Sequence, residues 1–146
     1  MFFHIFPSSV PDNVYNTFRR DLPNQIVHGA LQPLYLAVGA VVIKQSLLGA
    51  DWEVAALQAS MMAGFFISLF YVEWGKSWTP VSLIVMSGGI GRASLIAIAL
   101  VTESVSFTTL VCIASFLDAL TTPALGIVYQ RNYPSTMRGR IVSFTR

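Results

Sequence analysis

Four long apolar runs constrain this chain more than any other feature of its sequence. They cover residues 26–43, 54–72, 81–101 and 107–128. Each falls within the roughly 17–25 residues that a helix needs to cross the hydrocarbon core of a bilayer. None shows the strict alternation of a barrel strand, and in lipid only helices and closed barrels satisfy the backbone hydrogen bonds. The runs therefore predict an all-α membrane protein with four transmembrane helices.

The composition supports the same class of protein. Charged residues make up 11% of the chain, against about 25% in soluble domains, and 54% of the residues are hydrophobic. A net charge of +2 is too small to indicate nucleic acid as a partner. The single cysteine, Cys112, excludes a disulfide framework and a cysteine-based metal site. No catalytic triad, metal cluster or phosphate loop appears, so we expect neither an enzyme nor a cofactor.

Short links between the runs predict two antiparallel helical hairpins in one domain, residues 26–130. Residues 1–25 are polar and contain prolines, and two interpretations of them stay open. They are either an interfacial segment that uses Tyr15 and Phe18 or a disordered cytoplasmic leader. Residues 131–146 form a second cytoplasmic segment.

Basic residues are distributed unevenly between the two sides of the predicted helices. By the positive-inside rule, both termini are expected in the cytoplasm of a multi-pass protein of the plasma (inner) membrane. One side carries only Lys44. The other carries Arg19, Arg20, Lys76, Arg131, Arg138, Arg140 and Arg146.

Two of the predicted helices carry a polar stripe with a proline beside it. Such stripes indicate helices that face a water-filled cavity rather than lipid. The alternative is an interfacial histidine, with hydroxyl groups that bond to their own backbone. The stripes comprise His28, Gln32 and Tyr35 beside Pro33 in the first helix, and Ser115, Asp118 and Thr122 beside Pro123 in the fourth.

Two charged residues, Arg92 and Asp118, lie near the middle of the third and fourth runs. A charge at mid-membrane costs at least ~2.5–3.5 kcal/mol, so such residues usually pair or line a polar cavity. We therefore expect an ion pair or a shared cavity, as a candidate site for a substrate or a coupling ion. The alternative is an arginine that extends to the interface and a protonated aspartate.

Small residues recur at a spacing of four in the second and third runs. This spacing lets helices approach closely in lipid, so it predicts packing faces. The residues are Ala56, Ser60, Gly64 and Ser68 in the second run, and Ser87 with Gly91 and Gly89 with Ala93 in the third.

The segment "TTPALGIVYQRNYPSTMRGRIVSFTR" at residues 121–146 resembles the fourth helix and the following cytoplasmic loop of major facilitator superfamily transporters. Pro134, Arg138, Gly139 and Arg140 carry this resemblance. The segment "HGALQPLYLAVGAVVIKQSLLGADWEVAALQASMMAGFF" looks like the first two helices of that family. Together the resemblance covers roughly residues 19–146.

The chain departs from the family pattern at two places. The loop between helices two and three usually reads G-x-x-x-D-R-x-G-R, whereas this chain has Glu73 for the aspartate and Leu69 for the glycine. Asp118 stands where the family more often has an arginine. The resemblance implies a cytoplasmic gate formed by Glu73 and Lys76 in one loop and Arg138 and Arg140 in the next.

The resemblance further implies a secondary transporter that moves a small solute by alternating access. The chain would be an amino-terminal fragment, part of a six-helix half, and inactive without the remaining helices. One alternative is a four-helix subunit that pairs with a second copy in a small drug exporter, although the first helix lacks the glutamate of that class. Another is a membrane scaffold that binds partner helices.

Overall fold

The computed structural model describes residues 12–136, 138 and 139. Four helices in this part of the chain are long and apolar enough to cross a membrane, which confirms the prediction of an all-helical, multi-pass membrane protein. The first, here called the first helix, is continuous and combines α1 (Asp12–Pro33), η2 (Leu34–Val38), α2 (Gly39–Val41) and η3 (Val42–Ser46). It is followed by α3 (Asp51–Trp74), α4 (Pro80–Ile98) and α5 (Ser104–Asn132).

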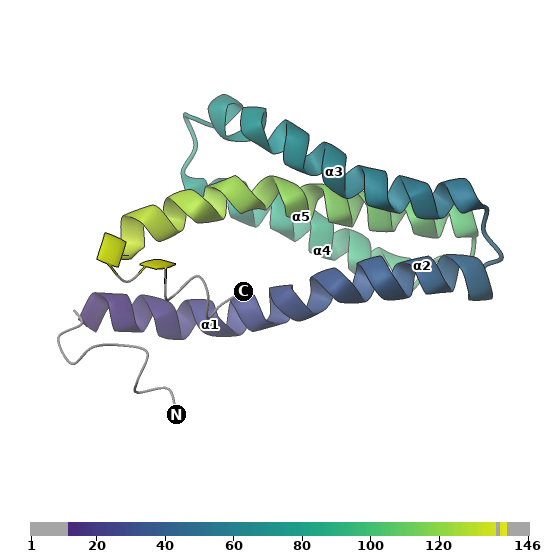
Figure 1. The fold of residues 1–146 in the computed structure, drawn as a ribbon, viewed down its shortest axis with the longest axis horizontal. Coiled ribbons are helices and arrows are strands. Elements are labelled where there is room, and N and C mark those ends of the chain that lie inside the picture. The colour runs from purple at the N-terminus through teal and green to yellow at the C-terminus, as the bar shows by residue number, and fades with distance from the viewer. Residues whose placement is uncertain (1–11, 137, 140–146) are drawn as a thin grey trace.

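Helix α5 is the centre of the bundle. It packs along most of its length against α3 on one side and α4 on the other, as Figure 1 shows. The first helix lies along the remaining side and contacts the other helices sparsely (Figure 1). The bundle is therefore a tightly packed group of three helices with a more loosely attached first helix.

Small residues allow this tight packing. A Cβ atom at Gly64 of α3 would lie 2.6 Å from the carbonyl oxygen of Phe116 and 2.7 Å from the Cβ of Ala119, both on α5. Ser68 and Ser87 are buried as well, and Gly91 of α4 faces α5 in ordinary contact. Gly89 has open space where a side chain would be. Of the two small-residue pairs predicted on α4, the pair of Ser87 and Gly91 therefore lies at a helix–helix contact.

The first helix begins at Asp12 and runs through Pro23, so the described part of the expected leader is neither proline-broken nor disordered. The physical reason is burial. Val14 and Phe18 pack against Tyr129 and Tyr133 at the end of α5, and all four side chains are buried. Removal of this apolar surface from water stabilises the additional helical turns and outweighs the hydrogen bond that proline lacks.

Two stretches of the first helix are π-helical, and η2 begins directly after Pro33. Proline has no N–H for the α-helical hydrogen bond, so the neighbouring backbone can adopt a wider turn. The first helix ends at Ser46, after η3. In the link to α3, Leu48 has a φ of 53°, in the left-handed region that is uncommon for a leucine.

A buried carboxylate joins the starts of α3 and α5. Glu53 accepts a hydrogen bond from the Ala50 N–H at 3.0 Å, one from Thr108 at 3.0 Å, and a third from Ser104. A Cβ atom at Gly49 would lie 2.7 Å from Ile43 and 3.0 Å from Glu53, so a larger residue in this turn would have to displace these side chains. The Glu53 carboxylate therefore fixes the position at which the chain enters α3 relative to α5.

The remaining helix ends differ from the predicted runs by a few residues. Helix α4 begins at Pro80, where the Thr79 side chain accepts a hydrogen bond from the Ser82 N–H at 3.1 Å and caps the helix. It ends at Ile98, and the next three residues continue with backbone hydrogen bonds to the residue three positions earlier. Helix α5 continues beyond residue 128 to Asn132, since Tyr129 is buried against α1.

Candidate functional site

A polar cavity of about 300 Å³ lies between the first helix, α4 and α5. Its walls combine apolar side chains and glycines with six polar residues from the three elements. This mixture is typical of a binding site, in which a few polar groups orient a ligand. The polar lining residues are Gln25, His28 and Tyr35 of the first helix, Arg92 of α4, and Asp118 and Thr121 of α5.

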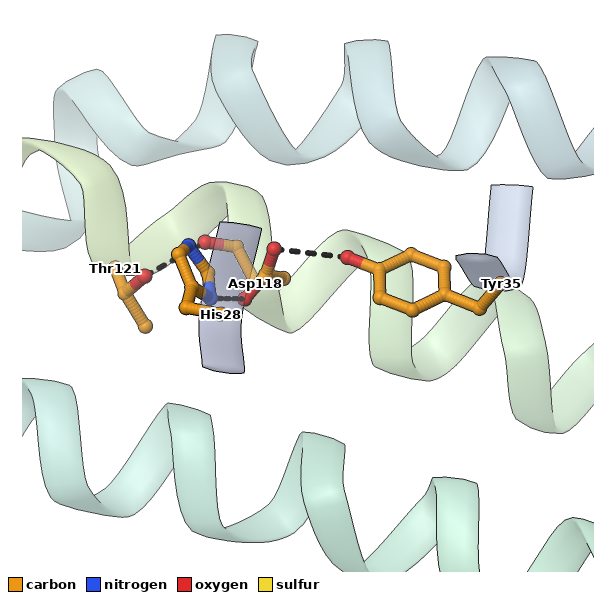
Figure 2. Close-up of polar contacts among 4 residues, drawn as sticks. All are labelled: His28, Tyr35, Asp118 and Thr121. Carbon is orange, nitrogen blue, oxygen red and sulfur yellow. Dashed lines mark hydrogen bonds and ion pairs between the residues drawn. The ribbon is translucent and has the colours of Figure 1, made fainter. Parts of the chain in front are cut away.

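The Asp118 carboxylate is the most connected group in this cavity. The Tyr35 hydroxyl donates a hydrogen bond of 2.8 Å to its Oδ2, and the His28 Nδ1 lies 3.3 Å from its Oδ1. Figure 2 shows Asp118 between these two side chains of the first helix. Both carboxylate oxygens therefore face a polar side chain of the first helix.

The site is partly open. The side chains of His28 and Asp118 are 27% and 21% exposed, so they are neither sealed in the core nor fully outside it. The Thr121 hydroxyl donates to the backbone carbonyl of Asp118 at 2.7 Å, one helical turn before it (Figure 2). Such a bond satisfies the hydroxyl locally and leaves the carboxylate to the first helix.

Arg92 lies on the α4 wall of the same cavity. Around it α4 contributes Gly88, Gly89 and Gly91, so this part of the wall has little side-chain bulk. The Arg92 residue is exposed in the isolated chain. The structure thus brings Arg92 and Asp118 into one cavity, while a direct ion pair between them stays a prediction.

The other predicted residues of the stripes lie elsewhere. Ser115 is buried, and its hydroxyl has no hydrogen-bond partner among the described residues. The described lining includes Thr121 in place of Thr122. Gln32 belongs to α1, but its side chain lies outside the described residues. The cavity-facing stripe of α5 is therefore rotated relative to the predicted one.

Sequence reasoning missed Gln25 and Thr121. The signal for Thr121 was present, because Ala114, Asp118, Thr121 and Leu125 follow the spacing of one helical face, and all four line the cavity. Gln25 fell in the expected leader. Its amide donates to Asp21 at 3.3 Å one turn earlier, which requires that the helix already exist there.

The predicted gate residues have other partners here. Glu73 forms an ion pair with Lys76 in its own turn, and both side chains are largely exposed. The Arg138 guanidinium donates to the carbonyl oxygens of Gln130 at 3.1 Å and Tyr133 at 3.2 Å, and so caps the end of α5. Arg140 lies outside the described residues. A contact between the two loops stays a prediction.

No group of three or more His, Cys, Asp or Glu side chains that could hold a metal ion occurs in the described part of the chain. Comparisons of this chain with protein-family models, with curated proteins and with solved structures find no match. A function for the chain therefore has to be argued from the cavity and the helices that enclose it.

Proposed function

We propose that this chain is part of a secondary transporter of the major facilitator type, which moves a small solute across a membrane by alternating access. The observation that carries the proposal is the cavity between the first helix, α4 and α5, with Arg92 and Asp118 in one lining. Charged groups inside membrane spans are costly, and they usually mark a pathway for substrate or ions. In transporters that work by alternating access, the substrate site lies near the middle of the bilayer.

The exposed surface supports a role alongside further helices. Large apolar side chains cover the outward face of α3, among them Phe66, Leu69 and Trp74. Lipid covers such an apolar surface well. The exposed Arg92 lies on a different helix, α4, and lipid does not solvate a charged side chain there. We infer that additional transporter helices, or a second copy of the chain, complete the cavity on this side, and that the chain alone is inactive.

The proposed arrangement in the membrane is two antiparallel hairpins, one formed by the first helix with α3 and one by α4 with α5. The protein would lie in the plasma (inner) membrane. Both termini would face the cytoplasm, because most of the basic residues lie on that side of the helices. The Glu73–Lys76 ion pair would then be cytoplasmic. In an outward-open state, Glu73 would exchange Lys76 for Arg138 or Arg140, at a gain of at most ~1 kcal/mol for exposed charges.

A labelling experiment tests whether water reaches the cavity as a transporter requires. Gly88 lines the cavity and has open space at its Cβ position, so Gly88→Cys is expected to fold normally. The variant also contains Cys112→Ser, so that position 88 holds its single cysteine. In sealed vesicles that contain this variant, a membrane-impermeant thiol reagent should label position 88 from one side. Cysteine reacts as the thiolate, which forms in water and not in lipid.

The matched control is Ile90→Cys, on the same helix two residues further on and exposed on an apolar face. We expect this position to stay unlabelled from both sides. If positions 88 and 90 are equally unreactive, the cavity has no aqueous path, and the transporter proposal is wrong.

A further inference from the structure

The polar groups of the cavity are unequally available to a ligand. We propose that the site binds a small solute with one anionic group, such as a carboxylate, on an apolar body, and that Arg92 is the residue that binds the anionic group. This inference rests on the proposed transport function and specifies its substrate class.

Asp118 is not placed to receive a cationic solute. Its Oδ2 accepts a hydrogen bond from Tyr35 at 2.8 Å, and its Oδ1 lies 3.3 Å from the His28 Nδ1. A bound ammonium group would have to share this carboxylate with two side chains that already contact it in a partly buried site. The arrangement therefore disfavours a cation at the one carboxylate in the described lining.

Arg92, unlike Asp118, can bind a further charged group without losing a partner that it already has. A guanidinium carries five N–H donors in a planar fork, so it can keep an existing partner and still bind a carboxylate through other donors. Gly88 and Gly89 lie beside it in the lining and leave room for a ligand to approach. A charge-assisted hydrogen bond from arginine is stronger than one between neutral groups.

The charges of the lining also favour an anion. Among the described residues that line the cavity, Arg92 is a cation, Asp118 is a carboxylate, and His28 carries either no charge or one positive charge. Their sum is neutral or positive, and never negative. The summed charge of the lining therefore either attracts an anion or has no net effect on it. It does not attract a cation.

The rest of the lining fits a compact apolar body. Ile84, Val85, Leu95 and Leu125 contribute aliphatic surface around the polar groups. The volume of about 300 Å³ lies at the lower end of the ~300–1,000 Å³ typical of ligand sites. A single aromatic ring with one charged substituent matches both the size and the chemistry.

Three probes of nearly equal shape test the inference: benzoate, neutral benzamide and cationic benzylamine. Binding to the purified chain in detergent is measured by saturation-transfer NMR. Benzoate should bind at least about tenfold more tightly than benzamide, the factor expected when a charge-assisted hydrogen bond replaces a neutral one. Benzylamine should bind more weakly than either.

Arg92→Gln should reduce benzoate binding to the level of benzamide. Arg131→Gln removes a basic residue at the exposed end of α5, outside the described lining, and should leave benzoate binding unchanged. If Arg92→Gln does not fold, the protection assay on Gly88→Cys replaces it. Benzoate, and not benzamide, should then slow the labelling of position 88.

Preference for benzylamine, equal binding of benzoate and benzamide, or no binding of any probe to the folded chain would each overturn the inference. The transport proposal is tested separately, because the labelling of Gly88→Cys from water does not depend on which solute binds. A labelled cavity without selectivity for benzoate would leave the transporter standing and reject the anionic substrate.

Discussion

Two tyrosine hydroxyls of this protein differ in whether they have a hydrogen-bond partner, and single substitutions can test the effect of that difference. The Tyr35 hydroxyl donates to Asp118 at 2.8 Å, inside the cavity. The Tyr133 hydroxyl is buried at the end of α5 and has no hydrogen-bond partner among the described residues. Burial, and after it the nearby Asp21 carboxylate, raises the pKa of the Tyr133 hydroxyl above its usual value, so this phenol stays neutral.

Replacement of each tyrosine by phenylalanine should therefore have opposite effects. Tyr35→Phe removes a donor to a carboxylate and should lower the free energy of unfolding by about 0.5–2 kcal/mol. Tyr133→Phe removes an unsatisfied polar group and should be neutral or stabilising. Unfolding of the purified variants in mixed detergent micelles, followed by circular dichroism, measures both. An unchanged free energy of unfolding in Tyr35→Phe would mean that the Tyr35–Asp118 hydrogen bond contributes nothing to stability.

At this scale the sequence identified most of the polar residues of the cavity, because a polar group within an apolar run is conspicuous. His28, Tyr35, Arg92 and Asp118 were selected on that ground, and all four line the cavity. The choice between Thr121 and Thr122 could not be made in the same way. Neighbouring residues on a helix point about 100° apart, and the packing of α5 against both α3 and α4 decides which one faces the cavity.

At the scale of the helix, the approach of α3 to α5 depends on Gly64. A methyl group at this position would overlap the backbone of Phe116 and the Cβ of Ala119. Backbone atoms cannot move aside as a flexible side chain can, so the two helices would have to separate. The same separation would loosen the cavity, because α5 carries Asp118.

Gly64→Ala should consequently reduce the free energy of unfolding by about 1–3 kcal/mol, the usual cost of overpacking. Gly126→Ala on α5 is the control, because open space surrounds that position, and it should be neutral or slightly stabilising. The detergent unfolding assay compares the two variants. An equal response would show that the α3–α5 contact tolerates a larger spacing than the structure indicates.

The start of the first helix was beyond what local sequence could predict. Pro23 and the polar residues around it favour a break, and the propensity of this segment for helix is poor. Its helical form depends on Val14 and Phe18 meeting Tyr129 and Tyr133, more than a hundred residues later in the chain. Tertiary contacts of this kind override local preference, and a pattern within one window does not contain them.

For the whole molecule, the proposed orientation makes a direct prediction about labelling. Single cysteines at Ser77 and Ser135, in a Cys112→Ser background, should react with impermeant reagents from the cytoplasmic side alone. A cysteine at Thr102, in the exposed turn between α4 and α5, should react from the other side alone. Labelling of position 77 from outside would reverse the orientation and, with it, the assignment of Glu73 and Arg138 to a cytoplasmic gate.

The loose attachment of the first helix has a consequence for how the protein is made. Its polar contacts with the bundle centre include the hydrogen bond from Tyr35 to Asp118, and 83 residues separate the two. At a synthesis rate of ~5–20 residues per second, the ribosome needs roughly 4–17 s to travel from one to the other. For that interval the newly inserted segment resides in the bilayer without its acceptor. The first helix can therefore dock onto the bundle only after α5 has emerged.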